Sequence, residues 1–158
     1  MAIVNIRDTG RNSAKTSDVR ELATKVQKPS DTEAITAANT ITAAESGTRF
    51  VMNTATARIQ TLPSPAAGLE YWFYVGATEP TSSHTIVTAS SANIIVGNVS
   101  SPEDAAGSVA TVTDADTITL VASKAVHGDY VHVWSDGTNW YLDGQVKVQD
   151  GITTTQAS

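Results

Sequence analysis

The three histidines are the residues of this chain with the greatest chemical potential. His84 follows two serines, His127 is followed by a glycine and an aspartate, and His132 lies in an apolar run. A serine hydrolase would place such a base beside a nucleophile on a tight turn and an orienting carboxylate. The chain has no Gly-x-Ser-x-Gly turn, and it has no cysteine to replace the serine. We therefore expect no catalytic residues and no enzymatic activity.

The sequence also gives little support for a metal site or a phosphate-binding site. Asp114 and Asp116 could offer two carboxylates to calcium, but the glycine and distal glutamate of an EF-hand loop do not follow. Paired zinc-ligand spacing is missing, as are both Gly-rich phosphate-binding patterns. The two aspartates are more simply interpreted as a solvated turn before a strand. The sequence predicts no metal and no cofactor.

Four consecutive aromatic residues form the best candidate for a binding surface. In a strand, Tyr71 and Phe73 would point to one face, and Trp72 and Tyr74 to the other. The outward pair could stack on a sugar. Core packing on one side and a protein interface on the other is the simpler account, because tyrosine and tryptophan are enriched at interface centres. We expect Trp72 and Tyr74 to contact a protein partner.

The elements that would position these residues are short strands. Alternating apolar and polar residues, rich in threonine and valine, recur at short, regular intervals between glycine, proline and Asp-Gly turns. This pattern predicts an all-β body, either a β-sandwich or a jelly-roll or barrel-like fold. The expected strands cover residues 48–52, 57–62, 70–75, 85–88, 93–96, 117–121, 130–134, 140–142 and 145–148.

Residues 31–46 fit two structures. Ser30 and Glu33 have capping-box spacing, and the alanines that follow favour helix. Against this, β-branched residues alternate at 35–37 and 40–43. We favour strand, with a turn at residues 45–47.

A β-hairpin around the Ser-Asp-Gly-Thr-Asn turn is the clearest local element. Alternation places Tyr130, His132 and Trp134 on one face, and two valines on the other. The chain then returns Trp140 close to Trp134. We expect one of these indoles in the core and the other at an edge or interface, so both belong to the candidate interface.

The chain divides into an N-terminal arm, residues 1–32, and a body, residues 33–158. Residues 1–30 carry six lysines and arginines against three carboxylates, whereas residues 31–158 carry four against thirteen. Few large apolar residues and no aromatic ones occur in the arm, so it cannot build a core. The asymmetry predicts an acidic body that repels nucleic acid and a basic, extended arm with a separate task.

Within the arm we expect one short amphipathic helix and one contact surface. Val19, Leu22 and Val26 would share a helix face. Together with Arg7 and Arg11, that face is expected to become ordered on a partner.

No apolar run of the chain approaches the ~20 residues of a membrane span, and the lack of cysteine fits synthesis in a reducing cytoplasm.

Several segments of the body resemble those of a known group of proteins. They are Ile-Thr-Ala-Ala-Glu-Ser-Gly at 41–47, Thr-Leu-Pro-Ser-Pro-Ala-Ala-Gly at 61–68, Tyr-Trp-Phe-Tyr-Val-Gly at 71–76, Lys-Ala-Val-His-Gly-Asp-Tyr at 124–130 and Ser-Asp-Gly-Thr-Asn-Trp-Tyr at 135–141. Together they resemble small β-rich virion proteins of tailed bacteriophages that decorate or cement capsids. The similarity covers roughly residues 40–145.

This resemblance implies a structural virion protein on the capsid exterior, made in the host cytoplasm. Its partner would be the major capsid protein, and it would form a homo-oligomer, with a trimer favoured. The last of these segments also resembles hairpins of phage tail fibres. The alternative is therefore a tail-fibre or receptor-binding module that docks on host surface glycan.

Overall fold

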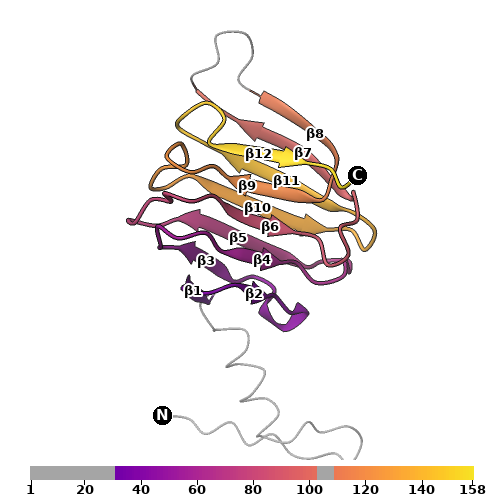
Figure 1. Ribbon diagram of the computed structural model, residues 1–158. Coiled ribbons are helices and arrows are strands. Elements are labelled where there is room, and N and C mark those ends of the chain that lie inside the picture. The colour runs from indigo at the N-terminus through magenta and orange to yellow at the C-terminus, as the bar shows by residue number, and fades with distance from the viewer. Residues whose placement is uncertain (1–30, 103–108) are drawn as a thin grey trace, which may run out of the picture.

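The computed structural model describes residues 31–102 and 109–158, which fold into two stacked β-sheets (Figure 1). The predicted all-β, sandwich-like body is confirmed. One 3-10 turn, η1 (Ala43–Glu45), is the sole helical element in these ranges. None of the helical structure there is long and apolar enough to cross a membrane.

The larger sheet has seven strands. In spatial order they are β1 (Thr32–Ile35), β3 (Arg49–Met52), β5 (Glu70–Val75), β10 (Tyr130–Ser135), β11 (Trp140–Gln145), β7 (Ile95–Ser100) and β8 (Val109–Ala115). The smaller sheet has the order β12 (Ile152–Thr155), β9 (Thr117–Leu120), β6 (His84–Val87), β4 (Ile59–Thr61) and β2 (Asn39–Thr40).

The chain enters the fold by winding between the two sheets. Strands β1 to β6 alternate between the larger and the smaller sheet, and each of β1 to β4 pairs in parallel with the next strand of its own sheet along the chain. Strands β5, β10 and β11 then pair antiparallel, as do β6, β9 and β12. Both sheets are consequently mixed.

The core lies between the sheets, where the inward residues of each strand meet. In β5 the burial alternates strictly, so that Tyr71 and Phe73 are buried while Trp72 and Tyr74 are partly exposed. The Phe50 and Phe73 rings stack with centroids 5.3 Å apart. Burial raises the pKa of Tyr71 to about 12, and its hydroxyl donates a 2.9 Å hydrogen bond to the Thr42 carbonyl.

Most predicted strands are present, and the differences have local causes. Within residues 31–46, strands β1 and β2 form as favoured, whereas residues 43–45 form η1. Glu45 rather than Glu33 accepts a 2.7 Å hydrogen bond from a backbone N–H, that of Thr42. Strands β8 and β12 were not predicted. The expected strand at 145–148 is wrong, because β11 continues through Gly144 to Gln145 and residues 146–151 lie outside any strand.

Gly97 lies inside β7 and does not terminate a strand. Its φ of +146° disfavours any other residue, and an ideal Cβ built on it would overlap the carbonyl oxygen of Leu142 on β11. The pairing of β7 with β8 also shifts register between Ile95 and Gly97. This glycine therefore allows the backbones of β7 and β11 to approach where the ladder is irregular.

Candidate functional site

Six ring side chains gather on the outer face of the larger sheet, across β5, β10 and β11. We call this the aromatic face; its members are Trp72, Tyr74, Tyr130, His132, Trp134 and Tyr141. The register explains it, because Tyr130 pairs with Tyr74, His132 with Trp72, and Trp134 with Tyr141. Directly opposed residues on one sheet face are close enough for their rings to touch. The β5–β10–β11 order thus assembles the surface.

Four of the rings form one cluster around Trp72. The Trp72 indole stacks on His132 with centroids 3.9 Å apart and planes at 11°. Tyr74 lies nearly parallel to Trp72 at 6.1 Å, and Tyr130 is tilted at 5.8 Å from both. Each ring restrains its neighbours, so little side-chain freedom remains to be lost when a partner binds.

The other two rings, Trp134 and Tyr141, form a stack at the hairpin end. Their centroids are 4.2 Å apart and their planes differ by 13°. The Asp136 carboxylate accepts a 2.9 Å hydrogen bond from the Tyr141 hydroxyl, besides backbone N–H bonds from Thr138 and Asn139. The backbone hydrogen bonds lower the pKa of Asp136, and the bond to Asp136 raises the pKa of Tyr141. The turn aspartate therefore orients an aromatic pair.

A buried carboxylate fixes the start of β10. Asp129 is 1% exposed. Its two oxygens accept hydrogen bonds from the backbone N–H groups of Val126 at 2.9 Å and Lys147 at 3.1 Å. Burial raises the pKa of Asp129 against the effect of these bonds. The carboxylate ties the loop before β10 to the segment after β11, at the end of the hairpin away from its turn.

Charged groups border the rings. Glu70 precedes Trp72 by two residues on β5, and its carboxylate lies 3.4 Å from Nε2 of His132, without hydrogen-bond geometry. Asp143 pairs with His132 from β11. Burial raises the pKa of Tyr130, and the charge of Asp143 adds to the effect. An aromatic centre with a polar border is the usual anatomy of a protein interface.

The predicted interface residues do not all lie on one surface of the structure. Trp72, Tyr74 and Trp134 lie on one face, and Trp134 is 43% exposed. As expected, one indole of the hairpin lies in the core: it is Trp140, which is fully buried and packs 5.8 Å from Tyr71, so Trp140 does not belong to the candidate interface. The predicted arm residues lie outside the described ranges: Arg7, Arg11, Val19, Leu22 and Val26.

Tyr130, His132 and Tyr141 were not predicted as site residues, although a signal existed. Alternation already placed Tyr130 and His132 on the face of Trp134. The missing information was that β5 neighbours β10, a pairing between segments far apart in the chain that no local pattern specifies.

The three histidines lie in different parts of the structure and do not form a catalytic relay with one another. His84 is fully buried on β6; its Nδ1 accepts a 3.0 Å hydrogen bond from the Arg58 N–H, and its Nε2 donates at 2.9 Å to the Thr54 carbonyl. These bonds occupy both ring nitrogens. His127 is exposed in a loop, and His132 belongs to the aromatic face. The geometry of His84 is that of a structural histidine held neutral.

This arrangement predicts a pH-dependent stability. Burial, the largest cause, lowers the pKa of His84. The unfolded chain takes up a proton near pH 6.5, while the folded chain does so only at lower pH. Between these values the unfolded state binds more protons, so the free energy of unfolding should fall as the pH drops below about 6.5, by up to about 1.4 kcal/mol per pH unit. Urea denaturation between pH 7.5 and 5.5 measures the slope. His84→Gln should flatten it; an unchanged slope would assign the dependence to other groups.

The acidic pair differs from the expected solvated turn. Asp116 is only 8% exposed, and Asp114 has a φ of +54° at the end of β8. Within residues 31–102 and 109–158, no group of three acidic or histidine side chains could hold a metal ion.

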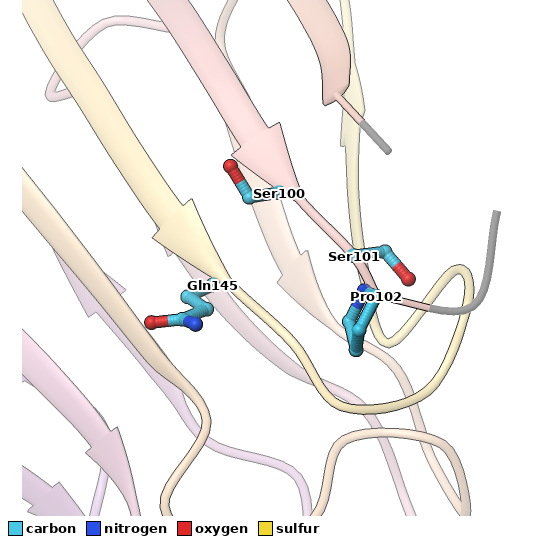
Figure 2. Close-up of a pocket in the computed structure, with 4 residues that line it drawn as sticks. All are labelled: Ser100, Ser101, Pro102 and Gln145. Atoms are coloured by element: carbon cyan, nitrogen blue, oxygen red, sulfur yellow. The ribbon is translucent and has the colours of Figure 1, made fainter. Parts of the chain in front are cut away.

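A shallow pocket of about 200 Å³ opens at the end of β7 and β11 (Figure 2). Its lining is two hydroxyls, a proline and an amide: Ser100, Ser101, Pro102 and Gln145.

No family model matches the chain, and no curated protein or solved structure is significantly similar to it.

Proposed function

We propose that this chain is a non-enzymatic structural protein of a tailed-bacteriophage virion, which binds the outer surface of the capsid and stabilises it through protein–protein contacts. The observation that carries the proposal is the aromatic face. Its rings are ordered by mutual stacking and by a rigid sheet, and tryptophan and tyrosine dominate the energetics of protein interfaces. The capsid resemblance of five body segments indicates which kind of partner is bound.

The way the rings stack favours a protein partner over a glycan. A sugar ring stacks on an open aromatic face. His132 covers one face of Trp72 at 3.9 Å, and Tyr141 covers one face of Trp134 at 4.2 Å. Stacked rings standing side by side on a sheet offer edges and polar tips, which suit the mixed apolar and hydrogen-bonding surface of a protein. Docking on host surface glycan, as a tail-fibre module would do, is the second candidate.

Binding of this kind would stabilise the capsid by mass action. A protein that binds the assembled shell and not its separated subunits shifts the equilibrium towards the shell. The basic arm, residues 1–32, would add a second contact to the major capsid protein or to a neighbouring copy. Its excess of lysine and arginine complements acidic surfaces, including the acidic body of another copy. The resemblance further suggests a trimer at the binding position.

Sedimentation of purified capsids with the full chain and with a variant lacking residues 1–30 tests this proposal. We expect the full chain to co-sediment and the truncated chain to remain folded, by circular dichroism, but largely in the supernatant. Electron microscopy of native particles supplies the location. Density on the tail, or retention of the chain on host polysaccharide without binding to capsids, would favour the glycan-docking alternative. Undiminished binding of the truncated chain would remove the arm from the interface.

A further inference from the structure

The outer face of the smaller sheet consists of β-branched residues. One row crosses all five strands in register and consists of Thr40, Thr61, Val87, Thr117 and Thr155. The adjacent row crosses four strands and consists of Ile59, Thr85, Thr119 and Thr153. Their neighbours along the strands, such as Ile86 and Ile118, point into the core. We call these two rows the threonine face.

This surface has no charge. Strands β2, β4, β6, β9 and β12 contain no aspartate, glutamate, lysine or arginine, and their one histidine, His84, is buried. The surfaces of soluble proteins usually carry interspersed charges of both signs, which oppose self-association. On the larger sheet, by contrast, Arg49, Glu70 and Asp143 are all exposed. The threonine face therefore lacks the groups that keep a protein surface apart from its copies.

We propose that the threonine face binds the same face of a second copy of this chain across a two-fold axis. The negative charge of the rest of the body is the reason to expect a second copy at this neutral face. Residues 31–158 carry thirteen carboxylates against four basic residues, so two bodies repel each other wherever carboxylates meet. This uncharged face lets them approach without that repulsion.

The chemistry of the face is also self-complementary. A threonine hydroxyl both donates and accepts hydrogen bonds, so two identical rows satisfy each other, as an isologous interface requires. None of the seven hydroxyls bonds another described residue. Threonine, valine and isoleucine side chains are stiff about χ1, so little conformational entropy is lost on contact.

The size of the face sets the strength of the contact. Five strands about 4.8 Å apart, with two to four residues at about 3.3 Å each, give a footprint of roughly 20 by 12 Å at most. Two such faces bury less than the roughly 1,000 Å² of a stable interface. The dimer should thus form at about 10–500 µM and dissociate on dilution.

Sedimentation equilibrium of the purified full chain between about 5 and 500 µM tests the inference without any capsid. We expect reversible dimerisation. Thr85→Glu, at the centre of the face, should raise the dissociation constant at least tenfold, while Thr78→Glu in an exposed loop should not change it. Replacing both Thr85 and Thr119 by valine keeps the shape and the neutrality of the face but removes two hydroxyls, so it should weaken the dimer less than Thr85→Glu does.

Two results would overturn the inference: no dimerisation at any concentration, or a dimerisation constant that Thr85→Glu leaves unchanged. If Thr85→Glu does not fold, Thr153→Glu on the edge strand β12 places the charge where strand pairing is less demanding. Capsid binding is proposed for the opposite sheet. A chain that does not dimerise would therefore leave the proposed function intact, and a chain that does not bind capsids would leave this inference intact.

Discussion

Replacing Gly97 by alanine is expected to lower the free energy of unfolding by about 3–5 kcal/mol, from the combined cost of a strained φ and an overpacked contact. The new Cβ would overlap the Leu142 carbonyl oxygen and lie 2.8 Å from both its carbonyl carbon and its nitrogen. These atoms belong to the backbone of β11, so no side-chain rotation can relieve the clash. Thermal denaturation should show a midpoint lower by roughly 6–20 °C.

Gly47 supplies the matched control for this substitution. Its φ is +86°, but nothing lies within 4 Å of an added Cβ. Gly47→Ala therefore measures the backbone strain alone, about 1–2 kcal/mol. If Gly97→Ala destabilises the protein no more than Gly47→Ala, the close approach of β7 and β11 is wrong.

Truncation of either tryptophan of the aromatic face, Trp72→Ala or Trp134→Ala, is expected to weaken capsid binding at least about 30-fold. Tryptophans central to an interface typically contribute about 2 kcal/mol or more. A loss of about 1.4 kcal/mol corresponds to tenfold in affinity. Each substitution also removes a ring stack within the face. That contact contributes only about 0.5–1.5 kcal/mol to folding. The variants should therefore stay folded, and titration of capsids with labelled protein measures the loss.

Val109→Ala is the control for the tryptophan variants. Val109 is 54% exposed, more than Trp134, and lies on edge strand β8 outside the aromatic face. Its truncation should leave capsid affinity within about twofold. Equal losses in all three variants would point to a general effect on the fold. Unchanged capsid affinity in both tryptophan variants would exclude the aromatic face as the capsid contact.

Local patterns predicted the strands better than their partners. The alternation in 70–75 and 130–134 correctly divided core from surface, because the side-chain period of a strand is two residues. Glycine was the main source of error. Gly97 and Gly144 were interpreted as turns, yet both lie within strands, where they allow close backbone or side-chain approach. Composition alone does not distinguish a glycine that ends a strand from one that admits a neighbour.

Only part of the candidate site could be predicted, because the sequence does not specify which elements pack together. Trp72, Tyr74 and Trp134 could be assigned to strand faces, but which of Trp134 and Trp140 was buried depended on which side of the hairpin met the second sheet. The threonine face was not predicted at all. Its residues come from five strands that are widely separated along the chain, and each strand alone is an ordinary alternating segment.

The alternating course of β1 to β6 gives the protein a modular way to change size. Each circuit of the chain adds one strand to both layers, and the first two circuits pair only with the circuits beside them. A duplicated or deleted circuit of about 20 residues would therefore widen or narrow the molecule without disturbing the β10–β11 hairpin. Duplication or deletion of such circuits would therefore change the width of both sheets while leaving the rings on β5, β10 and β11 in place.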